Sequence, residues 1–334
     1  MKQLCQFLHQ PLAIGHRPPH PALSLVSACG TVETVIPFFF FILGTVIGSF
    51  LNVCISRIPE GLSIISPGSR CPRCLTPIKP YDNIPVFGWL LLRGKCRNCS
   101  LSISPMYPLV EFATGLIFLL TYYEYGISLL TLKWLIFSCL IIVLVVTDFR
   151  VRLLPDLVNF PGMAMGIVLA FRVPIADSTA GMFFFLLGFR RFPFQSDLFF
   201  NVLTAILGAL VGSMLLWGAA ALYKLVRKRE GMGMGDVKMM AMVGSFLGPR
   251  GTFLTILLGT LIGTVIGVLW IGILYLYGWK RRVAERAAKR GLGSVSTIRW
   301  AIASQYQLPL GTFLGIGALA VAYALPWLLS LADR

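Results

Sequence analysis

The sequence GMGMGDVKMM, residues 231–240, brings an acidic residue to the mouth of an apolar run. Asp236 follows three glycines that stand at alternate positions. A carboxylate at the edge of a hydrophobic segment is costly, so it needs a partner or a chemical role. A second acid, Asp148, occupies a matching position at the end of the apolar run FSCLIIVLVVTD. We therefore predict that Asp148 and Asp236 meet in the folded protein.

The composition places most of this chain in a lipid bilayer. Of its 334 residues, 57% are hydrophobic and only 13% are charged, and the mean hydropathy is +0.80. These values lie well outside the range of soluble domains. The net charge of +16 comes from short basic runs between apolar segments, which is typical of membrane-protein loops and not of a nucleic-acid-binding domain. We expect a polytopic membrane protein with no nucleic-acid partner.

The apolar runs predict an all-α membrane protein with about eight transmembrane helices. Gly44 and Gly48 in the first run permit close contact with a neighbouring helix. The run at 236–248 is short and could be a partly inserted helix. The runs cover about residues 35–56, 108–125, 132–148, 154–171, 199–223, 236–248, 251–277 and 308–330.

Alternate loops differ sharply in their basic content. Most of the 29 lysines and arginines fall in segments on one side of the membrane, at residues 57–97, 150–152, 224–238 and 280–299. Cytoplasmic loops carry the excess of Lys and Arg. Both acids and the polar segment after the first span are therefore expected to face the cytoplasm.

Four of the eight cysteines form two CxxC pairs, CPRC and CRNC, in the polar segment between the first and second spans. Their spacing suits tetrahedral zinc binding by four thiolates, against the alternative of two unlinked pairs. Four thiolates leave no open position on the metal, so the zinc would be structural and the polar segment would depend on it to fold. The expected ligands are Cys71, Cys74, Cys96 and Cys99.

Two close carboxylates in a poorly solvated site cannot both ionise, so one keeps a proton while the other activates water. That arrangement is suited to general acid/base hydrolysis of a peptide bond. The simpler alternatives are that Asp236 caps the helix that follows it and that Asp148 pairs with Arg150 or Arg152.

The glycines beside Asp236 favour the catalytic alternative. Gly231, Gly233 and Gly235 let a backbone approach closely and permit positive φ next to the acid. They are not a dinucleotide fingerprint, because no strand precedes them and a membrane span follows. Lys238, two residues after the acid, could lower the pKa of a neighbouring carboxylate or belong to the basic face.

Several motifs, taken in order, resemble those of the type IV prepilin peptidases, a family of bacterial intramembrane aspartic proteases of the GxGD class. The resemblance covers roughly residues 38–325, and the joint occurrence of its motifs in this order is highly specific. Besides the paired CxxC motifs, it rests on GSFLNVCISRIP at 48–59, ISPMYPLVEFATG at 103–115, TDFRVRLLPD at 147–156, GMGMGDVK at 231–238 and LPLGTFLGIGAL at 308–319.

The resemblance implies that Asp148 and Asp236 are the catalytic residues, with Gly233, Gly235 and Lys238 in a supporting loop. It also implies the substrates, which are prepilins or pseudopilins. Their basic leader would be removed at a glycine, on the cytoplasmic face of the bacterial inner membrane. Here the inference from the family agrees with the orientation given by the loop charges.

Many members of this family also methylate the new N-terminal amine with S-adenosylmethionine. That activity is tied to the zinc-bearing segment, which this chain keeps, so the resemblance implies a bifunctional enzyme. For methyl transfer the expected residues are Gly94, Lys95 and Glu111. The alternative for Glu111 is an acid favoured by the helix dipole near a helix start.

These inferences divide the chain into four parts. Residues 1–34 are expected to be a poorly structured leader and not a signal peptide, and 35–57 the first transmembrane helix. Residues 58–106 form the cytoplasmic zinc segment, and 107–330 the membrane aspartic peptidase domain. In addition, an insert at 173–197 and a basic loop at 278–306 exceed what the resemblance supplies.

Other functions remain open at this stage. A proline followed by Asp156 before an apolar run predicts a helix start, which gives that acid a structural explanation. A zinc-ribbon membrane scaffold without catalysis, or a peptidase without methyltransferase activity, would share most of these features. A transporter is less well supported, because only Glu111 and Glu124 add acids in or near the spans.

Overall fold

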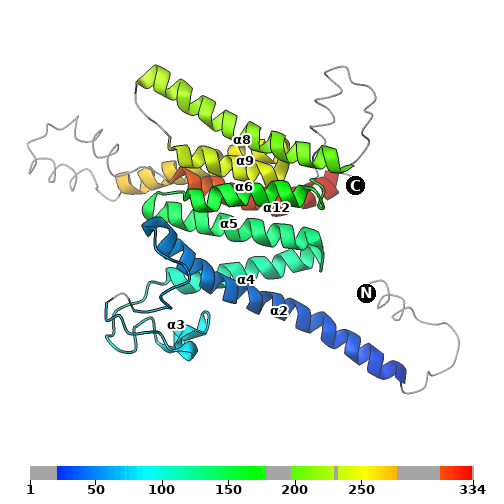
Figure 1. Cartoon of the computed structure of the whole chain (residues 1–334), viewed down its shortest axis with the longest axis vertical. Helices are drawn as coiled ribbons and strands as arrows, with labels where there is room; N and C mark the ends of the chain where they lie inside the picture. Colours follow the sequence, from blue (N-terminus) through cyan, green and yellow to red (C-terminus); the bar gives the residue numbers. More distant parts are fainter. Residues whose placement is uncertain are drawn as a thin grey trace, which may run out of the picture. The chain divides into compact units, whose positions relative to one another are not determined.

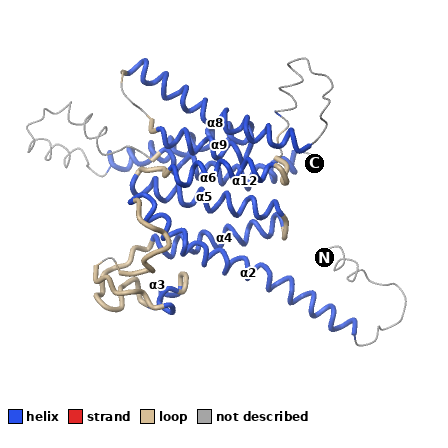
Figure 2. Tube along the Cα trace, in the orientation of Figure 1, coloured by secondary structure: helices blue, strands red, loops and turns tan. Residues whose placement is uncertain are grey.

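The computed structural model describes residues 21–71, 73–175, 177, 179, 197–228, 232–276 and 309–332. In this part of the chain the regular elements are helices, joined by loops (Figure 2), with two isolated β-bridges in the cysteine segment. The predicted all-α class is confirmed. The helices are α2 (Pro21–Arg57), η1 (Ile58–Glu60), η2 (Pro80–Asn83), α3 (Phe87–Leu91), α4 (Met106–Tyr125), α5 (Leu129–Val151), α6 (Asp156–Ala170), α8 (Asp197–Arg227), α9 (Met234–Leu276) and α12 (Leu310–Ala332) (Figure 1).

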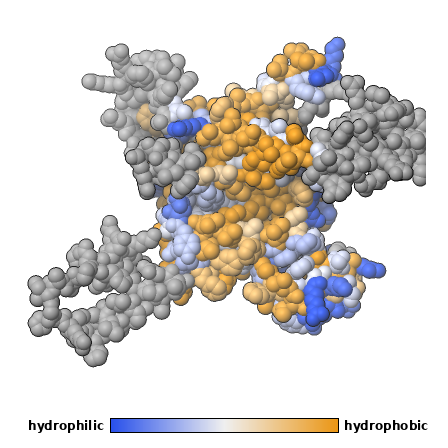
Figure 3. Space-filling model, turned by 180° about the vertical axis from the view of Figure 1, so that it is seen from behind, coloured by the Kyte–Doolittle hydropathy of each residue, from blue (hydrophilic) through white to orange (hydrophobic). Residues whose placement is uncertain are grey.

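Five of these helices are long and apolar enough to cross a membrane, and α6 and the first part of α12 are shorter apolar helices. Large hydrophobic side chains such as Phe38, Leu157, Trp217 and Leu261 point outward and are about half exposed or more. Figure 3 shows hydrophobic residues spread over the helices on one face of the molecule. Such a surface suits lipid and not water. The chain is a multi-pass membrane protein.

Helix α9 contains a break at Gly248, where φ is 74° and ψ is 177°. A Cβ placed on Gly212 of α8 would lie 2.9 Å from both the Met240 carbonyl carbon and the Thr252 side chain. Met240, before the break, and Thr252, after it, therefore lie beside the same residue of α8, so α9 folds back on itself at Gly248. The predicted runs at 236–248 and 251–277 are thus two antiparallel segments, and the count of eight spans is supported in part.

The local sequence explains this break. Only glycine adopts the backbone angles of Gly248 without strain, and Pro249 suits the first position of a new helix. The Asp177 carboxylate accepts a hydrogen bond of 2.8 Å from the Arg250 N–H. Asp177 thereby satisfies a backbone donor that the start of a helix would otherwise leave unpaired.

Helix α2 begins at Pro21, before the predicted first span. The part of it that is long and apolar enough to cross a membrane starts at Val35, where we expected the first transmembrane helix to begin. Residues 21–34 contain helix-compatible Ala, Leu, Ser and Val, and proline suits a helix start. Four other predicted features lie wholly or mostly outside the described residues, namely residues 1–20, the insert at 173–197, Gly231 and the loop at 278–306.

The chain divides into two compact units. The first contains residues 1–52 and 68–131, and therefore α4 and the cysteine segment. In it, α2 packs tightly on α4, because a Cβ on Gly44 or Gly48 would lie 2.8 Å from the Cα of Gly115 or Glu111. The close contact predicted for Gly44 and Gly48 is confirmed.

The second unit contains residues 53–67 and 132–334. Helix α9 packs against α8, α12 and α6. Gly208 of α8 and Gly244 of α9 face each other so closely that a Cβ on either would collide with the other's backbone. Small residues of this kind let membrane helices approach without relying on a hydrophobic driving force.

Candidate active site and four-cysteine centre

Three helix ends of the second unit meet at Asp148 and Asp236, beside one pocket. Asp148 lies in the last turn of α5 and Asp236 in the first turn of α9, and α12 begins beside them at Leu310. The pocket has a volume of about 550 Å³. It is lined by Ile58, Asp148, Arg152, Leu153, Leu154, Pro155, Asp156, Leu157, Gly233, Gly235, Asp236 and Lys238.

The structure brings the two acids together, as the sequence suggested. Asp148 Oδ2 and Asp236 Oδ1 each lie 3.0 Å from the position that a Cβ on Gly311 would take. The two oxygens can therefore be no more than twice that distance apart. Asp148 is buried and Asp236 is half-buried, so neither carboxylate is freely solvated. Their arrangement is that of an acid pair, while their catalytic role stays a prediction.

Asp148 is held by a residue that the sequence analysis did not single out. Its Oδ2 accepts hydrogen bonds from the Thr312 N–H at 2.6 Å and from the Thr312 hydroxyl at 2.9 Å. Among the described contacts, neither Arg150 nor Arg152 pairs with Asp148, so the structure does not favour that alternative. The signal for Thr312 in the sequence was the motif LPLGTF, whose Gly-Thr pair had no predicted role.

The glycines before Asp236 meet our expectation in part. Positive φ was predicted for them, but Gly233 and Gly235 have none. Gly235 supplies space instead, because a Cβ there would lie 3.0 Å from the Leu154 Cβ. Gly233 lies close to the Asp236 carboxylate. Close approach is therefore required at Gly235, whereas a Cβ on Gly233 would make only ordinary contacts.

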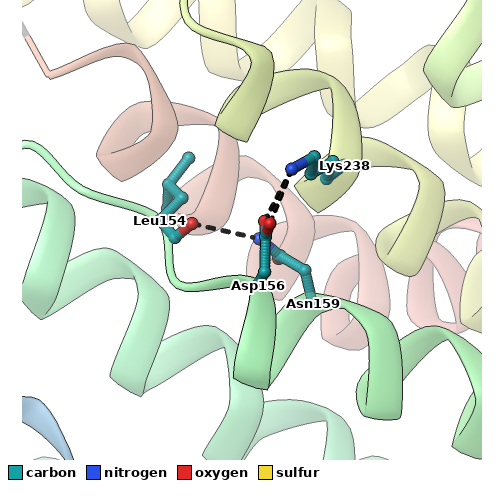
Figure 4. Close-up of polar contacts among 4 residues, drawn as sticks. All are labelled: Leu154, Asp156, Asn159 and Lys238. Atoms are coloured by element: carbon teal, nitrogen blue, oxygen red, sulfur yellow. Dashed lines mark hydrogen bonds and ion pairs between the residues drawn. The ribbon is translucent and has the colours of Figure 1, made fainter. Parts of the chain in front are cut away.

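Lys238 and Asp156 form an ion pair at the pocket (Figure 4). Lys238 Nζ lies 2.8 Å and 2.7 Å from the two Asp156 oxygens. Helix α6 begins at Asp156, as the sequence predicted. Lys238 is thus neutralised by a partner that we had considered only as a helix-start residue.

The four predicted cysteines gather into one cluster in the first unit. Their sulfur atoms all lie within 4.8 Å of one another. The Sγ atoms of Cys71 and Cys99 are 3.6 Å apart, and those of Cys74 and Cys96 are 4.0 Å apart. Tetrahedral thiolate sites with metal–sulfur bonds of about 2.3 Å need sulfur separations of about 3.8 Å. The four thiols can therefore hold one metal ion.

The two CxxC turns share one backbone design. The Cys71 N–H donates to Thr76 O and the Cys96 N–H to Leu101 O, at 3.1 and 2.8 Å. Hydrogen bonds with Thr76 lower the pKa of Cys74 to about 6, which favours a thiolate at neutral pH. Near-identical turns present both pairs of sulfurs to the same point, so the predicted linkage of the two pairs is confirmed.

An ion pair ties the second CxxC turn to η2. Arg97 donates to the two Asp82 oxygens at 2.6 and 2.9 Å. This contact holds the pKa of the Asp82 carboxyl below its usual range, so Asp82 remains ionised at neutral pH.

The three residues expected to serve methyl transfer occupy different settings. Gly94 has a φ of +68° and packs on Trp89, which explains the glycine structurally. Lys95 is exposed and pairs by its backbone with Ser102. Glu111 is 8% exposed and accepts a hydrogen bond of 2.7 Å from the Val86 N–H. In the described part of the chain, no contact joins Glu111 to Gly94 or Lys95.

Val86 itself is conformationally unusual. Its φ of 62° is rare for a β-branched residue. Such strain persists only where the surroundings fix it, and it often marks functional segments. The hydrogen bond from the Val86 N–H to Glu111 restrains this segment, and Ser49 and Asn52 lie near the same carboxylate.

Comparison with known protein families identifies two regions of the chain. Residues 42–125 match the bacterial Peptidase A24 N-terminal domain, and residues 135–268 match the type IV leader peptidase family. The first region contains the four cysteines and Glu111, and the second contains both acids.

Curated relatives match about two thirds of the chain. A prepilin leader peptidase/N-methyltransferase of Neisseria gonorrhoeae is 34% identical over 251 residues, which is 68% of this chain and 79% of the relative. Proteins of the same name from Klebsiella pneumoniae and Pseudomonas aeruginosa are 34% and 32% identical, over 66% and 69% of this chain and 90% and 79% of their own lengths. No solved structure matches the chain.

Proposed function

The chain belongs to the type IV leader peptidase family, and from this we propose that it cleaves the leader peptide of prepilins or pseudopilins and methylates the new N-terminus. The relatives carry both activities in their name. The observation that carries the proposal is the meeting of Asp148 and Asp236 beside Gly311. Two carboxylates from different helices converge on one pocket, at the ends of apolar helices where acids are costly.

The acid pair performs the hydrolysis. One carboxylate takes a proton from a water molecule, whose oxygen attacks the scissile carbonyl carbon. The other carboxylic acid donates its proton to the amide nitrogen that leaves, so the peptide C–N bond breaks and a new amine and a new carboxyl form. Thr312 holds the Asp148 carboxylate in place through two hydrogen bonds from uncharged donors.

Methyl transfer follows on the new amine. S-adenosylmethionine, when bound, supplies an electrophilic methyl group on sulfur. The amine nitrogen forms a bond to that methyl carbon as the carbon–sulfur bond breaks, and the amine loses a proton. Glu111 is a buried carboxylate suited to hold the new N-terminal ammonium group and to take its proton, so that the neutral amine is the nucleophile. Gly94 and Lys95 are the other residues proposed for this reaction.

The four cysteines bind a structural zinc ion. Their sulfur separations suit four-thiolate zinc, and such a site has no open position for catalysis. With few buried residues in the segment, the metal supplies what a hydrophobic core would otherwise provide. The zinc segment and the acid pair face the cytoplasm at the bacterial inner membrane, as the basic loops indicate.

The test is direct. Purified chain in detergent is incubated with a recombinant prepilin and with methyl-labelled S-adenosylmethionine, and the products are analysed by mass spectrometry. We expect a pilin that lacks its leader and carries one labelled methyl group on its N-terminal amine. Cleavage without methyl labelling would mean that the protein has peptidase activity but no methyltransferase activity. An intact prepilin would favour a zinc-ribbon scaffold instead.

A further inference from the structure

We propose that the Asp156–Lys238 ion pair is a positioning clamp, which holds the Leu154 side chain against the acid pair. The inference rests on the proposed peptidase function and assigns Asp156 and Lys238 as positioning residues, not as catalytic ones. It follows from four features of the pocket: the ion pair, the turn that it restrains, the seat of Leu154 and the support from Asn159.

The ion pair joins two helices at the edge of the pocket. Asp156 is the first residue of α6, and Lys238 lies in the turn of α9 that also carries Asp236. Both Asp156 oxygens contact the Lys238 Nζ (Figure 4), and the side chains are 54% and 32% exposed. Lys238 Nζ also lies 5.5 Å from the centre of the Phe160 ring. Two side chains of α6, Asp156 and Phe160, therefore contact the Lys238 ammonium group.

What the clamp holds is the turn between α5 and α6. This turn starts at Arg152, which has a φ of 55°, and ends at Pro155, so it leaves the helix carrying Asp148 and enters the helix that begins at Asp156. A turn with little regular structure needs side-chain contacts to fix its position. The link from Asp156 to α9 supplies such a contact.

Leu154, in the middle of this turn, lies beside both acids. A Cβ on Gly311 would be 2.9 Å from the Leu154 Cδ1, and the same point is 3.0 Å from one oxygen of Asp148 and one of Asp236. Leu154 also packs against Gly235. Its side chain thus forms a wall of the pocket at the place where the two carboxylates meet.

Asn159 gives the wall a second support from α6. It is 1% exposed, and its Nδ2 lies 3.5 Å from the Leu154 carbonyl oxygen, at the outer limit of a hydrogen bond. Its Oδ1 has no hydrogen-bond partner among the described residues. A weak backbone contact of this kind cannot hold the turn alone, which leaves the Asp156–Lys238 pair as the stronger restraint.

The pair is better suited to positioning than to stability. Partly exposed ion pairs contribute little to folding, about 0–1 kcal/mol. A displacement of about 1 Å near reacting groups can still reduce a rate by about a hundredfold. Loss of the ion pair should therefore lower kcat while the free energy of unfolding stays nearly unchanged.

The experiment measures kcat and KM for prepilin cleavage by purified D156N, K238M, K238R and the charge-reversed double variant D156K/K238D. We expect kcat to fall about tenfold or more in the first two, while KM changes by less than about threefold, because positioning and not substrate binding is lost. K238R should retain most activity, and the double variant should recover at least part of the lost kcat. Unchanged kcat in both single variants, or no recovery in the double variant, would overturn the clamp.

A matched control comes from the ion pair between Arg97 and Asp82 in the cysteine segment, which has similar geometry. Its disruption by R97Q should leave prepilin cleavage unchanged. Unfolding midpoints near that of the wild type would show that each variant is folded.

A readout that needs no cleavage separates the clamp from the proposed function. The substitution L154C is made in the wild-type and D156N backgrounds. The protein is treated with a maleimide, and the labelling of this position is quantified by peptide mapping. We expect D156N to raise the labelling rate severalfold, and an unchanged rate would count against the clamp. Failure of the wild-type protein to cleave prepilin would instead count against the proposed function.

Discussion

At the scale of single residues, the acid pair depends on the smallest residue near it. Gly311 lies in the first turn of α12, at the point where oxygens of Asp148 and Asp236 approach each other, and the Leu154 side chain lies at the same point. Thr312 follows and holds Asp148 by two hydrogen bonds. The Gly-Thr pair therefore sets both the room around the acids and the orientation of one of them.

The substitution G311A should reduce cleavage strongly while the protein still folds. The added Cβ would lie about 3 Å from both carboxylates and from the Leu154 side chain, so these three side chains must shift and the geometry of the acid pair is disturbed. We expect kcat to fall about tenfold or more, measured on purified protein. G218A is the control, because a Cβ on Gly218 meets nothing within 4 Å. Equal activity in G311A and the wild type would contradict this geometry.

The hydroxyl of Thr312 can be tested separately. T312V keeps the shape and the backbone donor but removes the O–H that donates to Asp148 at 2.9 Å. Hydrogen bonds to charged groups contribute about 1.5–3 kcal/mol, so we expect kcat to fall about tenfold or more. T312S should restore most of the rate. Normal turnover by T312V would mean that the backbone N–H alone positions Asp148.

The acids themselves could be predicted from sequence because each ends or begins an apolar run, where a charge needs a reason. Thr312 could not, since it acts on a residue far away in the chain and no local pattern records that contact. For Gly235 both close approach and positive φ were predicted. The close approach is confirmed by its contact with Leu154, whereas positive φ is not observed.

At the scale of elements, α9 shows what a sequence pattern can and cannot give. The two apolar runs at 236–248 and 251–277 predicted an interruption near residue 248. The reversal of direction depends on the backbone angles of Gly248 and on Asp177, which caps the second run from another segment. That tertiary contact has no signal in the local sequence.

The substitution G248A should destabilise the second unit. At a φ of +74° and a ψ of 177°, a side chain costs about 1–3 kcal/mol. We expect a lower thermal unfolding midpoint in detergent. G272A is the control, because that position has open space around it and alanine favours helix over glycine. An equal unfolding midpoint in G248A and the wild type would show that the helix break accommodates a side chain at residue 248.

At the scale of the whole molecule, each compact unit contains one centre. The four cysteines and Glu111 belong to the first unit, and every residue that lines the acid-pair pocket belongs to the second. The family matches follow the same division, at residues 42–125 and 135–268. The two proposed activities should therefore respond differently to damage in one unit.

Changing the four cysteines to serine should remove the metal and abolish methyl transfer while cleavage persists. Without thiolates the segment has too small a core to fold, whereas the pocket keeps all of its lining residues. Metal analysis, methyl labelling and prepilin cleavage on the same preparation check this. Equal loss of both activities would indicate that the acid pair needs the metal-bound segment.

The central claim is that Asp148 and Asp236 act as one catalytic pair, and prepilin cleavage by D148N and D236N in membranes tests it most directly. Asparagine keeps the shape of each side chain but can neither activate water nor supply an acidic proton. We predict that either substitution alone abolishes cleavage, with wild-type protein levels and metal content. Near-wild-type cleavage by either variant would contradict the pair.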